Sequence, residues 1–495
     1  MRHIYFSSLI ILTFYLAFSL KAQSNAGVWY FGLRAGVDFR SGQPVACYQG
    51  QLNSEEGVAI ASDTSGNLLF YTDGRYVWNA HHALMPNGTD LLGHPSSTQS
   101  AVIVPRPGSS HLYYLFTVDA EGGREGFRYS LVNMALHDSL GTVDSTQKIF
   151  LKAPVTEKLT AVRHRNGRDV WVVVHGWLND EFYAYLVTPE GVQAEPVISK
   201  TGTIHGLGYA MDVRGYLKAN PDGTNLALAL EESQLFEVFD FDNASGKVSH
   251  PVRGEFPAGF YPYGVEFSPD GSLLYISTPG VGKIYQFNLQ RNSAQDMLDS
   301  ATEVVGVYGR QWIGALQLGP DGKIYFPLYN QPYLGVIHQP NQPGLACQPQ
   351  THYVSLGNGL AQLGLPTFNQ SRFTPAVDTT AALESFDEIA LEDIEFKVDE
   401  TLVLDNIHFD YAQYTLQTPS FEELDRLAWV LNRSPELSIK LSGHTDNLGN
   451  KTENIVLSQK RAEAVKNYLL EKGVAASRIS YEGFGSRQPI ASNAT

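Results

Sequence analysis

Three histidines and two acidic residues in the first 375 positions could bind a metal ion or transfer protons. They are His164, His175, His205, Glu157 and Asp169. Imidazole and carboxylate groups are common zinc ligands and general acid-base catalysts. The five residues show no short metal-ligand spacing, however, and His175 ends an apolar run. We therefore expect core or rim histidines rather than a metal or acid-base cluster.

Two further features contain residue types that occur in catalytic or metal-binding sites. Residues 62–66 read Ser-Asp-Thr-Ser-Gly, which partly matches the Asp-box turn of sialidases but lacks the aromatic residue that follows there. An ordinary turn between strands is the stronger interpretation. The two cysteines, Cys47 and Cys347, are too few for a four-cysteine metal site. In an exported protein they either pair as a disulfide or remain two buried thiols.

Length and charge limit the class of protein. The chain has 495 residues, more than one compact core usually contains, and its 35 basic and 51 acidic residues give a net charge of −16. We expect no nucleic-acid partner, because phosphate binding needs a basic surface. Residues 1–22 contain a basic start and an apolar run up to Leu20, which predicts a cleaved signal peptide. An uncleaved membrane anchor is the alternative.

Short segments rich in β-branched and aromatic residues recur from residue 26 to residue 375. Three of them follow the tripeptide Pro-Asp-Gly, which starts at Pro221, Pro269 and Pro320, at spacings of 48 and 51 residues. This spacing is close to one four-stranded propeller blade. It predicts an all-β propeller of six or seven blades, with seven preferred, and a β-sandwich array as the alternative. We expect a split blade, in which the strand at 28–31 closes against the segment near Val354.

Four motifs of this region carry a family resemblance. They are Trp-Tyr-Phe-Gly at 29–32, Thr-Asp-Gly at 72–74, Thr-Glu-Lys-Leu-Thr-Ala-Val at 156–162 and Gly-Val-Glu-Phe-Ser-Pro-Asp-Gly at 264–271. The region resembles the WD40-like or TolB-like β-propellers exported by Bacteroidetes. The resemblance implies the fold and specifies no ligand.

The pattern changes after residue 375. Residues 376–399 contain eight acidic residues and one basic residue, which predicts an extended acidic linker. Strands are then predicted at 402–409, 437–441 and 479–484. Ser420 and Glu423 form a capping box before a first helix, and a second helix is predicted over 453–472. Alternating strands and helices predict an α/β sandwich over residues 400–495.

The motifs of residues 400–495 carry a second and closer resemblance. They are Asn-Ile-His-Phe-Asp at 406–410, Gly-His-Thr-Asp-Asn-Leu-Gly at 443–449, Asn454 with Leu457, Ser458 and Arg461, and Ser-Arg-Ile-Ser-Tyr-Glu-Gly-Phe-Gly at 477–485. In order and spacing this region is similar to the OmpA-like peptidoglycan-binding domain. Members continue with a further helix and strand that this chain lacks, so we expect a C-terminally truncated domain or an incomplete sequence.

The resemblance implies a site for the peptidoglycan stem peptide, whose diaminopimelate ends in one ammonium and one carboxylate. Asp446 matches the acid that binds the ammonium, and Arg461 matches the base that binds the carboxylate through its planar fork. Asn447, Leu448 and Asn454 shape the loop or bind the peptide backbone. Without the surrounding motifs, an Asp and Arg pair of this kind is more simply a structural salt bridge. His444 and Asp410 are expected to be structural.

Together these observations predict a non-catalytic envelope protein of the periplasm, associated with the outer membrane peripherally or indirectly. Its OmpA-like domain would bind peptidoglycan and its propeller a protein partner, with no cofactor or metal. The alternative is an exported propeller enzyme, a lyase or glycan hydrolase anchored to the wall. That alternative needs paired carboxylates or a histidine-rich metal cluster at the central mouth of the propeller. Convergence of acidic residues at the propeller axis therefore discriminates between the two.

Overall fold

The computed structural model describes residues 26–371, apart from 291, 292, 308–310 and 370, and parts of residues 407–485. The continuous C-terminal stretches are 439–444, 450–472 and 474–485. The chain divides into two units, Met1–Ser385 and Phe386–Thr495, which are considered separately below. The predicted signal peptide (1–22) and acidic linker (376–399) lie outside the described residues.

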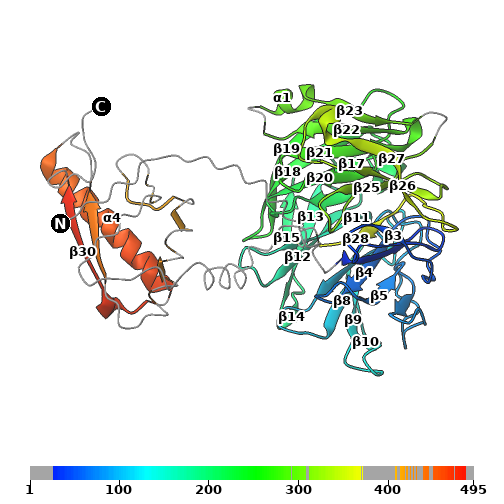
Figure 1. Ribbon diagram of the computed structural model, residues 1–495, viewed down its shortest axis with the longest axis horizontal. Helices are drawn as coiled ribbons and strands as arrows, with labels where there is room; N and C mark the ends of the chain where they lie inside the picture. The colour runs from blue at the N-terminus through cyan, green and yellow to red at the C-terminus, as the bar shows by residue number, and fades with distance from the viewer. Residues whose placement is uncertain are drawn as a thin grey trace. The chain divides into compact units, whose positions relative to one another are not determined.

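Seven sheets follow one another along the first unit and form a seven-bladed propeller, as predicted (Figure 1). The first four blades contain β1 (Val28–Phe31), β2 (Ala35–Asp38), β3 (Val45–Ala46); β4 (Val58–Ser62), β5 (Leu68–Thr72), β6 (Val77–Asn79); β7 (Ala101–Pro105), β8 (Leu112–Val118), β9 (Phe127–Asn133), β10 (Thr142–Lys152); and β11 (Val155–Arg163), β12 (Val170–Gly176), β13 (Glu181–Thr188), β14 (Gly191–Val192), β15 (Val197–Lys200).

The last three blades complete the ring. They contain β16 (Leu217–Ala219), β17 (Asn225–Leu230), β18 (Leu235–Asp242), β19 (Lys247–Glu255); β20 (Val265–Phe267), β21 (Leu273–Thr278), β22 (Lys283–Asn288), β23 (Thr302–Gly306); and β24 (Gln317–Leu318), β25 (Ile324–Pro327), β26 (Tyr333–Ile337), β27 (Pro349–Ser355). Short helices η2 (Ala210–Val213), η3 (Pro279–Val281), α1 (Ala294–Asp299) and η4 (Gly344–Cys347) lie in the connections.

The ring closes where the two ends of the propeller sequence meet. Strand β28 (Pro366–Thr367) pairs in parallel with β4 and contacts β1. The ring of Phe368, which follows β28, lies 5.9 Å from that of Trp29 in β1. A split blade is thus present, but both of its predicted segments are wrong. Strand β4 pairs with β28, whereas the strand at 28–31 pairs with β2. Val354 lies in β27 of the seventh blade, and Pro366–Thr367 complete the second blade instead.

The three Pro-Asp-Gly tripeptides form the turns between the first and second strands of the last three blades. Their glycines have positive φ angles of 75°, 70° and 73°, at Gly223, Gly271 and Gly322. Glycine adopts this region at no steric cost, which explains its place in the repeat. In the first of these turns, Asp222 Oδ1 accepts a hydrogen bond of 3.0 Å from the amide of Thr224. The repeat seen in the sequence is therefore a repeat of one turn.

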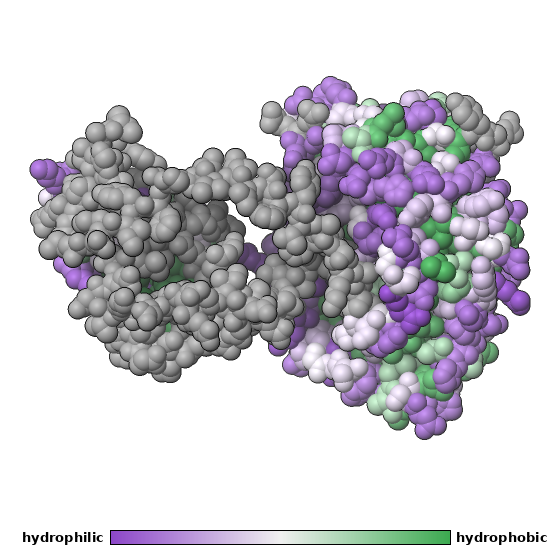
Figure 2. Space-filling model, viewed as in Figure 1, coloured by the Kyte–Doolittle hydropathy of each residue, from purple (hydrophilic) through white to green (hydrophobic). Residues whose placement is uncertain are grey.

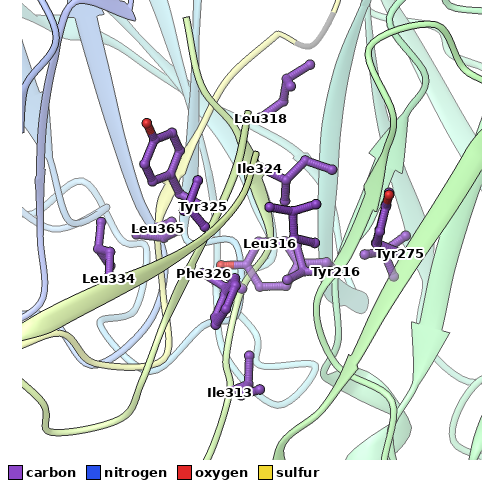
Figure 3. Packing of buried hydrophobic residues seen from close by; sticks show 14 of the residues in the cluster. Tyr216, Tyr275, Ile313, Leu316, Leu318, Ile324, Tyr325, Phe326, Leu334 and Leu365 are labelled. Atoms are coloured by element: carbon purple, nitrogen blue, oxygen red, sulfur yellow. The ribbon is translucent and has the colours of Figure 1, made fainter. Parts of the chain in front are cut away.

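Aromatic and aliphatic side chains fill the space between the sheets. Figure 3 shows Tyr216, Leu316, Ile324 and Phe326 packed in one cluster with Leu365, which leads into β28. Because Leu365 is buried there, the returning end of the chain is part of the core. On the surface, hydrophilic residues predominate on the visible face of the propeller, with smaller hydrophobic patches between them (Figure 2).

Buried polar side chains link the innermost strands of several blades. The Gln99 Oε1 atom accepts hydrogen bonds from the amides of Leu159 and Leu217, at 3.1 and 2.7 Å. These amides belong to β11 and β16, so one side chain joins three blades. Lys218 in β16 and Glu266 in β20 form an ion pair of 3.2 Å, and both are about 1% exposed. The propeller axis is thus held by polar contacts as well as by apolar packing.

The second unit contains the predicted strand, helix and strand in the predicted order. They are β29 (Ile439–His444), α4 (Lys451–Glu471), η6 (Ala476–Arg478) and β30 (Ile479–Gly485). Strands β29 and β30 pair in parallel, as a strand-helix-strand connection requires. Helical residues of the 420–431 segment pack Leu424, Ala428 and Leu431 against α4. The predicted strand at 402–409 lies almost wholly outside the described residues.

Helix α4 packs very closely on both strands through two glycines. A Cβ atom at Gly443 would lie 2.2 Å from the carbonyl oxygen of Ser458, and one at Gly483 would lie 2.3 Å from the amide nitrogen of Gln459. The Ser458 hydroxyl accepts a hydrogen bond of 2.9 Å from the amide of Gly485. The motif glycines and Ser458 therefore set the distance between α4 and the sheet.

We expect Gly443→Ala to destabilise the second unit by about 1–3 kcal/mol, because the added methyl group forces the helix away from the sheet. Hydrogen-deuterium exchange of α4 peptides in the full chain measures this, and exchange should become faster. The control is Val456→Ala, which removes an exposed side chain from the same helix. Unchanged exchange in the Gly443 variant would show that the packing is looser than described.

Candidate functional site

Arg461 lies in the middle of α4, as the sequence predicts, and is partly buried. Its Nε atom donates a hydrogen bond of 2.9 Å to the carbonyl oxygen of Gln413. Its guanidinium carbon lies 4.9 Å from the centre of the Phe409 ring, which comes from the 406–410 motif. A flat cation over an aromatic face is a favourable contact that also fixes the plane of the guanidinium. Phe409 and Gln413, four residues apart in the sequence, thus position Arg461.

Asn454 lies in the first turn of the same helix. The helix starts at the N-cap Asn450, whose side chain accepts a hydrogen bond of 2.8 Å from the amide of Thr452. This cap satisfies an amide that would otherwise have no partner. The start of α4 and the end of β29 at His444 flank the segment 445–449 in the sequence.

The structure describes only part of the predicted peptidoglycan site. Asp446, Asn447 and Leu448 lie outside the described residues, as does Asp410. Arg461 and Asn454 are described, and both lie on α4. The pairing of Asp446 with Arg461 across one ligand therefore stays a prediction.

His444 was expected to form structural hydrogen bonds at the end of its strand. Instead its ring stacks on that of Phe484, with centroids 5.5 Å apart and an interplanar angle of 14°. Its Nδ1 atom is buried, and no described residue forms a hydrogen bond with it. His444 thus contributes through ring packing between β29 and β30.

The histidine group predicted in the propeller is divided between two places. His164 and Asp169 share one turn, where the His164 amide donates to the Asp169 carbonyl oxygen at 2.8 Å. His175 and His205 stack on each other at 3.6 Å and are completely buried. Burial lowers the pKa of His175 to about 3 and that of His205 well below its usual value, so both are neutral. The expectation of core histidines is confirmed for this pair.

Glu157 meets another acid, Glu56. Glu56, in the loop before β4, is close enough for the Glu157 charge to raise its pKa. Burial is the larger cause, and the pKa of Glu56 rises to about 8. The Tyr263 hydroxyl donates a hydrogen bond of 2.8 Å to Glu56 Oε1. Two carboxylates on different blades thus converge at one end of the propeller.

Hydrogen bonds from the protein occupy both carboxylate oxygens of Glu157. Its Oε2 atom accepts from the amide and the hydroxyl of Thr98, both at 2.8 Å. Its Oε1 atom accepts from the amide of Glu121 at 2.9 Å. Sequence reasoning selected Glu157 but missed Glu56, Tyr263 and Arg214. These residues come from distant loops, so no local spacing could have revealed the group.

The alternative of a disulfide is corrected by the structure, in which Cys47 and Cys347 are free thiols. They lie beside different tyrosines, Cys47 next to Tyr30 and Cys347 next to Tyr275. Burial raises the pKa of each thiol to about 11, so both are protonated and unreactive at neutral pH. Cys47 borders a cleft of about 360 Å³ that Tyr30 and His82 also line.

The Asp-box interpretation also resolves into an ordinary turn. The Asp63 carboxylate accepts hydrogen bonds of 2.8 Å from the amides of Ser65 and Asn67, which closes the connection between β4 and β5. No group of three or more histidine, cysteine or acidic side chains is placed to hold a metal ion within the described ranges. Among the helices of those ranges, none has the length and hydropathy needed to cross a membrane.

Comparison with known proteins locates the family of the second unit. Residues 408–495 match the model of the OmpA family. The chain is 45% identical over 75 residues to the peptidoglycan-binding protein ArfA of Mycobacterium tuberculosis, which is 15% of this chain and 23% of that protein. It is 36% identical over 83 residues to the peptidoglycan-associated lipoprotein of Pasteurella multocida, which is 17% of this chain and 55% of that protein. The chain thus spans between 23% and 55% of the length of these relatives.

Over the propeller, the chain is similar to a solved protein from Lactobacillus plantarum, at 14% identity, with 62% of this chain and 82% of that chain covered and a TM-score of 0.36.

In the second unit, the matched family range contains Arg461, Asn454 and the two glycines against which α4 packs. Residues 408–495 of this chain form an OmpA-like C-terminal domain.

Proposed function

We propose that this chain is a non-catalytic tether of the cell envelope. Its OmpA-like domain binds peptidoglycan, and its propeller binds a protein partner. The observation that carries the first part is the family match over 408–495, together with two relatives whose names state peptidoglycan binding or association. A periplasmic location associated with the outer membrane follows from the same proposal and from the predicted signal peptide.

The proposed ligand is the diaminopimelate end of a stem peptide. Asp446 binds its ammonium, and Arg461 binds its carboxylate with two parallel N–H donors. The position of Arg461 supports this role, because Phe409 and the Gln413 carbonyl hold the guanidinium in a fixed plane. Asn447, Leu448 and Asn454 complete the loop side of the site.

Co-sedimentation with purified sacculi tests the proposal. The chain without residues 1–22 is expected to pellet with sacculi, whereas Asp446→Ala is expected to stay largely in the supernatant. The ammonium of the ligand then lacks its partner, which costs about 2–5 kcal/mol, a loss of roughly thirty-fold or more. Equal pelleting of both proteins would reject Asp446 as a ligand residue.

An exported propeller enzyme is the second candidate, and one observation favours it: Glu56 and Glu157 converge at one end of the propeller. Their surroundings argue for binding rather than catalysis. Glu157 is completely buried, and both of its oxygens already accept hydrogen bonds from the protein. A general acid or base needs an oxygen within reach of a substrate proton. Absence of hydrolytic or lyase products from glycan substrates is the result expected of the tether.

A further inference from the structure

We propose that the end of the propeller carrying Glu56 and Glu157 binds a lysine or arginine side chain of a protein partner. This inference rests on the part of the proposed function that gives the propeller a protein partner. It adds the place and the chemistry of that contact. The peptidoglycan site belongs to the other unit and takes no part in it.

The first observation is an unfilled acceptor. Glu56 Oε1 accepts a hydrogen bond from Tyr263, and the Ser96 side chain also acts on this carboxyl group. Within the described residues, however, no donor reaches the buried Oε2 atom with hydrogen-bond geometry. Only 6% of the Glu56 surface is exposed. When Glu56 is ionised, a buried acceptor without a donor is unfavourable, and such acceptors are rare in folded proteins. A donor that enters from the adjoining end of the propeller would satisfy it.

The second observation is the charge around that acceptor. Five acidic residues and two basic residues influence one another here: Glu56, Glu121, Glu157, Asp212, Glu231, Lys158 and Arg214. The bases are already engaged. Lys158 Nζ donates to the carbonyl oxygens of Asp212 and Arg214, and Arg214 lies 3.3 Å from the carboxylate of Glu121.

The excess of negative charge selects a cation. Because no metal-binding group of three or more side chains forms within the described part of the chain, an ammonium or guanidinium is the better complement. An ammonium or guanidinium donates several hydrogen bonds in different directions. One of them can reach Glu56 Oε2 while others reach the neighbouring acidic side chains.

The third observation identifies the source of the cation as a protein. Large apolar side chains are exposed on loops at the same end of the blades: Leu178, Ile204, Leu207, Tyr209, Met211, Tyr261 and Trp312. These loops lie before an innermost strand or between the second and third strands of a blade, as do the loops of Glu56, Arg214 and Glu121. Exposed aromatic and apolar side chains around a polar centre are typical of protein interfaces.

Side-chain contacts join this apolar rim to the carboxylates. The ring of Trp312 lies 6.0 Å from that of Tyr329, whose hydroxyl donates a hydrogen bond of 3.3 Å to Glu55. Glu55 directly precedes Glu56. Tyr209 and Met211 lie in the segment that ends at Arg214. One surface therefore presents both apolar side chains and the acidic centre.

The proposal has a pH signature. Glu56 faces Glu157, Tyr263, Tyr216, Ser96 and Arg214, and burial with the Glu157 charge raises its pKa to about 8. Below that pH Glu56 carries a proton, which a bound cation must displace. Affinity for a cation is therefore expected to increase as the pH rises through 8, with release of a proton. A partner bound through apolar contacts alone would show no such dependence.

The test uses the full chain without residues 1–22 and two fluorescent peptides, Leu-Leu-Lys-Leu-Leu and the same peptide with norleucine in place of lysine. Fluorescence anisotropy is expected to show about tenfold tighter binding of the lysine peptide, since its ammonium makes charge-assisted hydrogen bonds. Glu56→Gln should remove this preference and its increase between pH 7 and 9. Trp312→Ala should weaken both peptides alike.

The matched control is Glu190→Gln, an exposed glutamate in the turn between β13 and β14, at the opposite end of the blade. It should bind both peptides as the wild type does. Equal affinity of the two peptides for the wild type, or an unchanged lysine preference in Glu56→Gln, would overturn the proposal. Binding of anionic vesicles in place of either peptide would also overturn it. Sacculus binding, measured on the same samples, reports separately on the wall-binding part of the proposed function.

Discussion

Arg461→Ala is expected to lower the affinity of the chain for sacculi by about 2–5 kcal/mol, because the ligand carboxylate is left without its cation. Arg461→Lys should give an intermediate loss. Lysine keeps the charge but cannot donate two parallel hydrogen bonds from a flat group. It also cannot reproduce the contact of the guanidinium with the Phe409 ring at 4.9 Å. The measurement is the fraction of protein that pellets over a series of sacculus concentrations.

A structural role for Arg461 has to be separated from ligand binding. Its Nε atom holds the Gln413 carbonyl oxygen, so the alanine variant also loses an internal hydrogen bond. Hydrogen exchange in α4 provides the control. If exchange in α4 is unchanged and binding is lost, Arg461 contacts the ligand. If the variant pellets as well as the wild type, the assignment of Arg461 is wrong.

Lys218→Met is expected to destabilise the propeller by about 3–5 kcal/mol, because it leaves the charge of Glu266 buried without its partner. Lys218 and Glu266 are each about 1% exposed, and their charged atoms lie 3.2 Å apart. Lys218 also donates to the side chain of Gln317 in the next blade. The pKa of Lys218 is lowered by burial, and Glu266 opposes that shift. Each of these buried charges is therefore stabilised by the other.

Urea unfolding followed by tryptophan fluorescence measures this effect. Five of the six tryptophans lie in the propeller sequence, so the signal reports mainly on that unit. In the double variant Lys218→Met and Glu266→Gln, the loss should be smaller than the sum of the two single losses, since no unpaired charge remains. Additive losses would show that the pair is not coupled. Arg253→Met, which removes an exposed ion pair with Glu255, should change stability by less than 1 kcal/mol or so.

Local patterns predicted most of the elements correctly. The Pro-Asp-Gly turns at 221, 269 and 320 are recognisable because a positive φ at the third position demands glycine, and this requirement is local. Helix α4 and strands β29 and β30 follow from periodicity and from motif order in the same way. The closure of the ring was placed wrongly near Val354, because the pairing of residues 366 and 367 with β4 of the second blade depends on contacts across more than 300 residues.

The propeller site shows the same limit. Glu157 was visible as a candidate, but its partner Glu56 lies about one hundred residues earlier, on another blade. Only closure of the ring brings the two carboxylates, Tyr263 and Arg214 together. The histidines were grouped by type, whereas the strands carry His164 and His175 to opposite ends of one sheet. The period of the sequence predicts each blade. Which side chains of different blades lie together at the axis depends on closure of the ring.

The most direct test of the central claim compares two kinds of sacculi in the co-sedimentation assay. One kind carries meso-diaminopimelate in its stem peptides, and the other carries lysine, which has the ammonium but lacks the second carboxylate. The account predicts that the chain without residues 1–22 pellets with the first kind and binds the second at least about tenfold more weakly, since Arg461 then has no anion to bind. Equal binding to both, or to neither, would contradict it.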